Sequence, residues 1–290
     1  MSAVPSEFSP AVVSRLRAAG CVFAEDEARL LYGAATSPAE LDALVERRAA
    51  GLPLEQVLGW AGFAGLRIAV APGVFVPRRR TELLAGQPVR LAGRLPAPLV
   101  VDLCCGSGAV AAAVAAALPA AVVHAADLDP AAVRCARRNL DPARVHEGDL
   151  YGALPAALRG RVDVLVANTP YVPSGLIDLL PREARIHEPR LALDGGPDGL
   201  DVLRRVVAGA PGWLAPGGHL LVETSADQAA LVAAIVAGAG LRPRQLHDAD
   251  LDATMVRARV VPPPAIRPPA IGAAAVQAPV VGAAVRRALG

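Results

Sequence analysis

Three kinds of hydrophobic pattern follow one another along the chain. Between residues 10 and 50, apolar positions recur at helical spacing between polar ones, and Ser37-Pro38 supplies a start for the last of these helices. Between residues 52 and 82, apolar pairs are broken by glycines, which predicts a β-hairpin. From about residue 98, strand-like runs alternate with Ala-rich helical stretches, so we expect a parallel sheet wrapped by helices.

Short apolar runs predict the strands of this sheet, at 99–103, 121–127, 162–167, 219–223, 242–247 and 254–261. No helical pattern separates the last two runs, which indicates an antiparallel hairpin. The chain is thereby divided into an N-terminal helical domain (1–50), a β-hairpin linker (51–90), an α/β domain (91–261) and a Pro/Ala-rich tail that we expect to be disordered (262–290).

The uncharged stretch 103–126 is long enough to span a bilayer, but Gly106-Ser107-Gly108, Pro119 and His124 interrupt it. We predict a strand, a turn and a helix of a soluble core there, and no membrane partner. No signal peptide pattern is present. The cysteines lack CxxC spacing, which indicates free thiols in a reducing cytoplasm; they are Cys21, Cys104, Cys105 and Cys135.

The amino-acid composition and the absence of certain motifs argue against several classes of catalytic site. All 29 basic residues are Arg, so a Schiff-base lysine and the lysine of a phosphate-binding loop are both excluded. The histidines form no HExxH motif and no GxSxG elbow occurs, so neither a metal site nor a serine hydrolase is predicted. A net charge of +2 provides no broad positive electrostatic field that would attract nucleic acid. A nucleic-acid partner is therefore not favoured.

A candidate ligand loop runs from Asp102 to Gly108, where the strand at 99–103 ends and a helix begins. Small residues there allow a ligand to approach the backbone N–H groups. Asp127 follows Gly108 by nineteen residues and ends the next predicted strand. Because parallel strands end at one edge of the sheet, the loop and Asp127 can hold one nucleoside-like ligand, with Asp127 accepting from the ribose hydroxyls.

A second candidate site is Asn168-Thr169-Pro170-Tyr171, which closes the apolar run 162–167. Asn occurs only at positions 139 and 168, so its placement before Pro-Tyr is informative. An ordinary turn remains open as an explanation, because Asn-x-Pro is common turn chemistry. A strand that delivers an amide and an aromatic ring to its carboxyl end nevertheless favours a site.

The loop at 102–108 is not a dinucleotide fingerprint, because position 111 is Ala. It resembles the D-x-G-x-G-x-G loop of class I S-adenosylmethionine-dependent methyltransferases, with Cys104 in the first glycine position. We expect Cys there only if that residue needs no positive φ. The resemblance implies S-adenosyl-L-methionine as cofactor. The cofactor-binding residues it implies are Asp102, Cys104, Gly106, Gly108, Asp127, Asp149, Leu150 and Asn168.

In this resemblance, Asp149 takes the place of a carboxylate on the adenine amino group, although a helix or turn cap remains an alternative for it. The Asn168 motif is similar to the [DNS]-P-P-[YFW] motif of amino-group methyltransferases, with Thr169 replacing the first Pro. Residues 10–260 as a whole resemble the protein-(glutamine-N5) methyltransferases that modify release factors. The matching segments are 47–54, 73–78, 81–84 and 187–196.

The resemblance implies a Rossmann-like seven-stranded α/β fold, with the N-terminal helical domain recognising a protein substrate such as a peptide chain release factor. It implies methylation of glutamine N5 by the catalytic residues Asn168, Thr169, Pro170 and Tyr171. The Asn168 side-chain oxygen and the Thr169 carbonyl would accept both N–H groups of the acceptor amide and aim its lone pair at the methyl group. Tyr171 would pack beside the acceptor and face the cationic centre.

Two departures indicate a divergent paralogue. Thr169 removes the rigidity of a proline ring, and Arg79 and Arg80 stand where the family carries Pro and Glu in R-P-E-T-E. We hypothesise an acceptor that is more acidic than the usual Gly-Gly-Gln loop, with an ordinary charged loop as the alternative.

Two further motifs stay outside the predicted catalytic set. His187-Glu188 is expected to tie the segment after Tyr171 to the core, and Glu223 either supports the acceptor loop or caps its strand. Other functions also stay open: small-molecule N-methylation, adenine-N6 methylation of nucleic acid, or a non-catalytic cofactor-binding or interaction module. A nicotinamide oxidoreductase is disfavoured by the spacing of the loop.

Overall fold

The computed structural model describes residues 10–260. The predicted disordered tail at 262–290 lies outside the described residues. Four helices come first and share one apolar cluster; they are α1 (Pro10–Ala18), α2 (Ala24–Ala34), α3 (Pro38–Ala49) and α4 (Leu54–Leu58). The predicted start of α3 is confirmed, because the Ser37 side chain accepts from the Glu40 N–H at 3.2 Å and Pro38 occupies the first turn.

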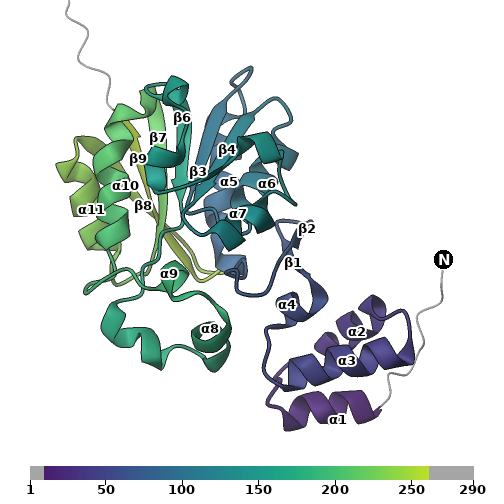
Figure 1. The fold of residues 1–290 in the computed structure, drawn as a ribbon. Coiled ribbons are helices and arrows are strands. Elements are labelled where there is room, and N and C mark those ends of the chain that lie inside the picture. Colours follow the sequence, from purple (N-terminus) through teal and green to yellow (C-terminus); the bar gives the residue numbers. More distant parts are fainter. Residues whose placement is uncertain (1–9, 261–290) are drawn as a thin grey trace, which may run out of the picture.

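In Figure 1, α1, α2 and α3 are set apart from the rest of the molecule, and α4 lies between them and the β1–β2 region (60–69). Arg48 is buried and pairs with Glu27 of α2 and with Glu183 of α8 (Arg182–His187), at 2.6 Å in each case. Because an isolated buried charge is very costly, these two carboxylates and the Leu52 carbonyl, which also accepts from Arg48, offset the burial of the guanidinium. The pairing links the helical unit to the segment that follows the Asn168 motif.

A small antiparallel hairpin follows, formed by β1 (Trp60–Phe63) and β2 (Leu66–Ala69). It lies within the range predicted as a hairpin linker, which also contains α4, the short 3₁₀ turn η1 (Arg79–Thr81) and most of α5 (Glu82–Ala92). The Asn139 side chain accepts from the Ala69 N–H at 2.8 Å and donates to the Ala69 and Ser107 carbonyls. The hairpin is thereby tied to the loop at the end of β3.

The core of the molecule is a seven-stranded sheet in the order β5-β4-β3-β6-β7-β9-β8. All strands are parallel except β9, which runs antiparallel to both neighbours, so the predicted final antiparallel pair is confirmed. The strands are β3 (Leu99–Leu103), β4 (Val122–Asp127), β5 (Val145–Glu147), β6 (Val162–Ala167), β7 (Leu214–Thr224), β8 (Leu241–Asp248) and β9 (Ala253–Val260). The sequence pattern missed β5, whose three residues are too few to show a period.

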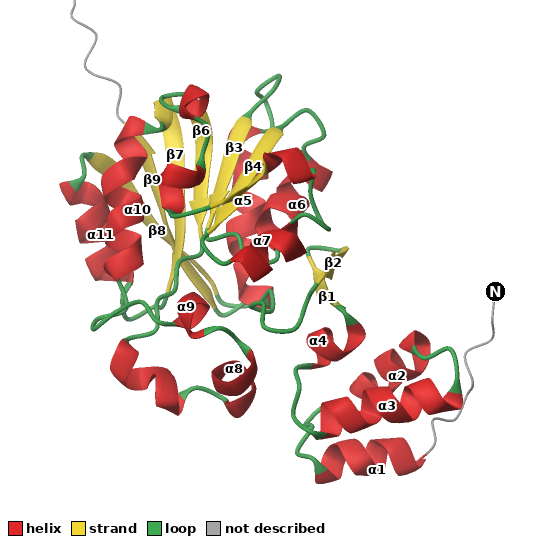
Figure 2. Ribbon diagram, viewed as in Figure 1, coloured by secondary structure: helices red, strands yellow, loops and turns green. Residues whose placement is uncertain are grey.

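Helices cover both faces of the sheet (Figure 2). One apolar cluster joins the sheet to α5, α6 (Ala109–Ala117) and α7 (Pro130–Ala136), and a second joins it to α10 (Asp201–Gly209) and α11 (Ala229–Gly238). The predicted α/β fold class is confirmed. From β3 the chain continues to β4 on one side of the sheet, and β6 later pairs with β3 on its other side. The direction in which strands are added therefore reverses between β3 and β6, and open α/β sheets bind ligands at such a point.

The uncharged stretch 103–126 divides into the end of β3, the loop, α6 and β4, as predicted. Across residues 10–260, none of the helices combines the length and the apolar character that crossing a membrane requires. The segment after β6 carries the short helices α8 (Arg182–His187) and α9 (Arg190–Leu193), which lie below the carboxyl edge of the sheet in Figure 1.

Asp102 anchors the start of α6 from inside the sheet. Its side chain is buried and its Oδ2 accepts from the Ala111 N–H at 3.1 Å. Burial raises the pKa of Asp102 from 3.8 to about 7, a shift that the Ala111 hydrogen bond opposes and the nearby Asp127 charge reinforces. The ionised carboxylate therefore costs stability that an uncharged side chain of the same shape would not.

We expect Asp102→Asn to flatten the fall in stability with rising pH. A folded pKa above the unfolded one gives stability that is complete below the unfolded value, near 3.8, and lost as the pH rises through about 7. At 1.36 kcal/mol per pH unit, wild type should lose about 3 kcal/mol relative to Asp102→Asn between pH 5 and pH 8. Urea unfolding across this range measures it, and parallel curves for the two proteins would contradict the assignment.

Candidate active site

The loop between β3 and α6 contains three residues with positive φ. Gly106 and Gly108 have φ of 55° and 77°, and Cys104 has φ of 55°. The expectation that Cys104 would need no positive φ is wrong: the first glycine position of the loop keeps its left-handed backbone although a side chain now occupies it. The Cβ makes this conformation costly by about 1–2 kcal/mol.

Asp127 lies beside this loop at the end of β4. Its Oδ2 accepts from the Gly106 N–H at 2.8 Å and its Oδ1 from the Asp129 N–H at 2.9 Å. Burial raises the pKa of Asp127, and the two backbone donors counter that shift. The carboxylate is therefore fixed in place, and each oxygen retains acceptor capacity for a ligand hydroxyl.

The other two predicted acidic residues differ in their surroundings. Asp102 is committed to the Ala111 N–H inside the fold, so its contribution is to hold the loop and α6. Asp149 is half exposed and forms an ion pair with Arg205 of α10. Its side chain makes no capping bond to the following turn η3 (Leu150–Ala153), and Leu150 itself has φ of 46°. Asp149 and Leu150 both line the cavity described below.

The loop after β6 presents two oxygen acceptors. The Asn168 Nδ2 donates to the Thr81 Oγ1 at 3.4 Å, which leaves its Oδ1 on the other side of the amide. Within residues 10–260, no hydrogen bond ends on the Asn168 Oδ1 or on the Thr169 carbonyl oxygen. The Thr169 side chain is buried and its hydroxyl has no partner among these residues.

A glycine-rich segment supports this loop from behind. The Gly195 N–H donates to the Val172 carbonyl at 2.9 Å, and the Gln228 Nε2 donates to the Tyr171 carbonyl at 3.1 Å. Gly199 has φ of 79°, and a Cβ there would lie 2.3 Å from the Tyr171 carbonyl oxygen. No larger residue fits at this position, so the path of the loop after Asn168 depends on it.

Glu188 holds the 76–78 loop, which lies across the site from the loop after β3. Its buried carboxylate accepts from the Val76 N–H at 3.1 Å and from the Arg78 guanidinium at 2.7 Å through both oxygens. Burial raises the pKa of Glu188, and Arg78 opposes the shift. His187-Glu188 therefore ties the segment after Tyr171 to the 76–78 loop, which agrees with the structural role expected for it.

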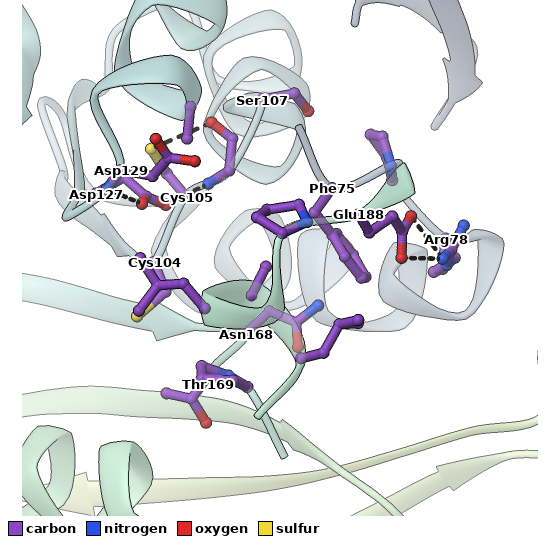
Figure 3. Close-up of a pocket in the computed structure, with 18 of the residues that line it drawn as sticks. Phe75, Arg78, Cys104, Cys105, Ser107, Asp127, Asp129, Asn168, Thr169 and Glu188 are labelled. Atoms are coloured by element: carbon purple, nitrogen blue, oxygen red, sulfur yellow. Dashed lines mark hydrogen bonds and ion pairs between the residues drawn. The ribbon is translucent and has the colours of Figure 1, made fainter. Parts of the chain in front are cut away.

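One cavity of about 590 Å³ joins these elements (Figure 3). In Figure 3, Asn168 lies between the Cys104 side of the cavity and the Glu188–Arg78 pair, with Phe75 nearby. Most predicted site residues line this cavity: Asp102, Cys104, Gly106, Asp127, Asp149, Leu150, Asn168, Thr169, Pro170 and Tyr171. Gly108 does not; it packs against α7 and the residues that follow it, where a Cβ would lie 3.1 Å from the Ala136 Cβ.

The cavity suits S-adenosylmethionine in size and charge. Its volume lies in the range of small-molecule sites. Asp127 and Asp129 place two carboxylates at one side of the cavity, which favours a ligand with a sulfonium and an ammonium group, whereas Asp149 is paired with Arg205. Asp127 lines the cavity with acceptor capacity left for the hydroxyls of a ligand, and the positive-φ loop brings the backbone of Gly106 to the cavity surface.

Several residues that shape the site were not predicted as part of it. Thr81 contacts Asn168, Arg205 pairs with Asp149, and Gln228 and Gly199 hold Tyr171. Thr81 lies in a segment that resembles the family, so the sequence carried a signal for it. Arg205 and Gln228 follow no motif, and only the fold brings them to the edge of the sheet.

The sheet, the loop after β3, the carboxylate that ends β4 and the Asn168 loop after β6 define the chain as a class I S-adenosylmethionine-dependent methyltransferase. The release factor glutamine methyltransferase of Geobacter sulfurreducens is 42% identical to it over 203 residues, covering 68% of this chain and 70% of that protein. The chain belongs to the release factor glutamine methyltransferase family. The predicted family, enzyme class and cofactor are thereby confirmed.

Other relatives widen the picture. A 4-amino-L-phenylalanine/4-methylamino-L-phenylalanine methyltransferase of Streptomyces pristinaespiralis is also 42% identical over 203 residues, covering 68% of this chain and 69% of that protein. The family model of ribosomal protein L11 methyltransferase (PrmA) matches residues 92–189. The T. thermophilus 16S rRNA N2 G1207 methyltransferase, solved with AdoMet and guanosine, shares the fold with a TM-score of 0.50 at 21% identity, covering 69% of this chain and 49% of that one.

We expect Cys104→Gly to stabilise the protein. Removing the Cβ from this left-handed position should stabilise the folded protein by about 1–2 kcal/mol. The greater conformational freedom of Gly in the unfolded chain should offset about 0.5–1 kcal/mol of that gain. The free energy of unfolding should rise by about 0.5–1 kcal/mol in urea titrations. Cys105→Gly is the matched control, because Cys105 is buried without a positive φ and its loss should destabilise. Equal destabilisation by both variants would contradict this account.

Proposed function

We propose that this enzyme transfers a methyl group from S-adenosylmethionine to the N5 nitrogen of a protein glutamine, in a substrate such as a peptide chain release factor. The observation that carries the proposal is the pair of oxygen acceptors at the cavity, the Asn168 Oδ1 and the Thr169 carbonyl, neither of which is used by the described residues. A primary amide has two N–H donors, which these two oxygens match.

The chemistry explains why two acceptors are required. An amide nitrogen is a poor nucleophile because its lone pair is delocalised into the carbonyl. Acceptors on both N–H groups hold the nitrogen in place, direct its lone pair along one line and stabilise the positive charge that develops on it. S-adenosylmethionine supplies an electrophilic methyl group when bound. The N–C bond forms as the S–C bond breaks, and the nitrogen then loses one proton to water, since an N-protonated amide is a strong acid.

Thr169 is compatible with this role because the acceptor is a backbone carbonyl. The ring of a proline would restrict the backbone, whereas here Gln228, Gly195 and Gly199 hold the loop through the carbonyls and N–H groups that follow it. Tyr171 is half-buried at the same wall, and we assign it to contact with the acceptor. A cytoplasmic location is part of the proposal, supported by four cysteines that form no disulfide with one another.

Asn168→Ala is expected to slow transfer strongly while leaving the cofactor bound. Purified enzyme is incubated with labelled S-adenosylmethionine and a release factor carrying a Gly-Gly-Gln loop, and the methylated peptide is located by mass spectrometry. Wild type should label that glutamine, and Asn168→Ala should reduce the rate by at least about 100-fold because one of the two acceptors is lost. Cofactor affinity, measured by calorimetry, should change little. Transfer by wild type to no glutamine at all would contradict the proposed function.

A small amine that carries a carboxylate is the second candidate acceptor. One observation favours it: Arg80 lines the cavity and, among residues 10–260, forms no ion pair, whereas Arg78 is committed to Glu188. A relative of equal identity acts, by its name, on 4-amino-L-phenylalanine, which is an amino acid. The same guanidinium would also suit an acidic peptide, so Arg80 bears on acceptor choice in either case.

Arg80→Glu and Arg79→Glu form a matched pair that separates acceptor recognition from general surface charge. Both side chains are exposed, but only Arg80 lines the cavity. For an acidic acceptor, Arg80→Glu should raise the KM of the acceptor by about tenfold, which corresponds to about 1.4 kcal/mol, while Arg79→Glu changes it by less than about twofold. Equal effects of the two variants would remove Arg80 from acceptor recognition.

A further inference from the structure

Glu223 is a buried carboxylate beside the acceptor loop that no step of the proposed reaction uses. It is 3% exposed, and its Oε2 has no partner among the described residues. β6 and β7 pair in parallel with Ala167 opposite Val222, so Asn168 and Glu223 come next at the same edge of the sheet. A strand-end cap would bind backbone N–H groups, but the groups close enough to lower the pKa of Glu223 are the hydroxyls of Thr81 and Tyr171 and the charge of Arg80.

The chemistry of these hydroxyls fixes the direction of the hydrogen bonds. An ionised carboxylate can only accept, and each hydroxyl has a single proton to donate. When the Thr81 hydroxyl turns its proton toward the Glu223 carboxylate, only the lone pairs of its Oγ1 are left for the contact with Asn168. A group that contacts the Thr81 Oγ1 must then be a hydrogen-bond donor, and the Asn168 Nδ2 donates to it at 3.4 Å.

We propose that Glu223 is a positioning residue which, through Thr81, sets which way the Asn168 amide faces. The Nδ2 is held toward Thr81, and the Oδ1 is therefore presented to the methyl acceptor. If the amide turned over, its oxygen would face a hydroxyl without a free proton, and its NH₂ would confront the N–H groups of the acceptor. This inference rests on the proposed function for the role of the Oδ1, but the orientation of the amide can be measured without any acceptor.

The cost of keeping Glu223 buried agrees with this role. Burial raises the pKa of Glu223, while Thr81, Arg80 and Tyr171, the groups that face it, all lower it toward the ordinary range. Tyr171 is affected in turn: burial and the Glu223 charge raise the pKa of its hydroxyl, which therefore stays protonated and donates. Glu223 thus orients two members of the Asn168–Tyr171 motif at once.

The kinetic test uses Thr81→Val, Thr81→Ser and Thr224→Val. Val keeps the shape of Thr but removes the hydroxyl, whereas Ser keeps the hydroxyl. Thr224 is the matched control, because it is buried next to Glu223 and its hydroxyl has no partner. Thr81→Val should lower kcat by about 10- to 100-fold with little change in cofactor affinity or Tm, Thr81→Ser should restore it to within a few-fold, and Thr224→Val should leave it unchanged. Equal kcat in wild type and Thr81→Val would overturn the inference.

A second measurement needs no acceptor, so it separates failure of this inference from failure of the proposed function. The chain has only two asparagines, so selective ¹⁵N-Asn labelling gives two side-chain amide signals. Thr81→Val and Glu223→Gln should shift the Asn168 signal, while Asn139, which is bonded to the Ala69 and Ser107 carbonyls, serves as an internal control. An unchanged Asn168 signal in both variants would overturn the inference even if glutamine methylation were demonstrated.

Discussion

The parallel pairing of β6 between β3 and β7 is the constraint on which the site depends. Parallel strands end at one edge, so the register that sets Leu103 beside Ala167 and Ala167 beside Val222 also places the glycine loop, the Asn168 loop and Glu223 side by side. These segments are separated by about 60 residues along the chain, and no local interaction would hold them together. A shift of register by one residue would turn Asn168 to the opposite face.

Three carboxylates at this edge show how the structure uses charge: Asp102 and Glu223 are buried, and Asp127 is half-buried. Asp102 holds the start of α6, Asp127 is fixed by two backbone donors, and Glu223 lies near the hydroxyls of Thr81 and Tyr171. Burial raises the pKa of each, which means that each ionised form is costly to keep. All three carboxylates lie at the carboxyl edge of the sheet, where they help to order the loop after β3, the end of β4 and the Asn168 loop.

Much of this arrangement could be predicted from the sequence, because each part has a local signature. The alternation of strands and helices gave the fold class, and the Asp102–Gly108 loop and the Asn168 motif marked two strand ends. Contacts made only by the fold could not be predicted: the Arg205 pair with Asp149, the Gln228 bond to Tyr171 and the place of Thr81 between Asn168 and Glu223. The positive φ of Cys104 was predicted wrongly, because the loop geometry is set by its surroundings rather than by the residue that occupies it.

The most direct test of the central claim is a crystal structure of the enzyme with S-adenosylhomocysteine and a peptide that carries the acceptor glutamine. The account predicts that the glutamine nitrogen lies at hydrogen-bond distance from both the Asn168 Oδ1 and the Thr169 carbonyl oxygen, with the Asn168 Nδ2 still on Thr81. It also predicts that the nitrogen, the position of the transferred methyl group and the sulfur lie in line. An acceptor held by other groups, or an Asn168 amide turned so that its Nδ2 faces the glutamine, would contradict it.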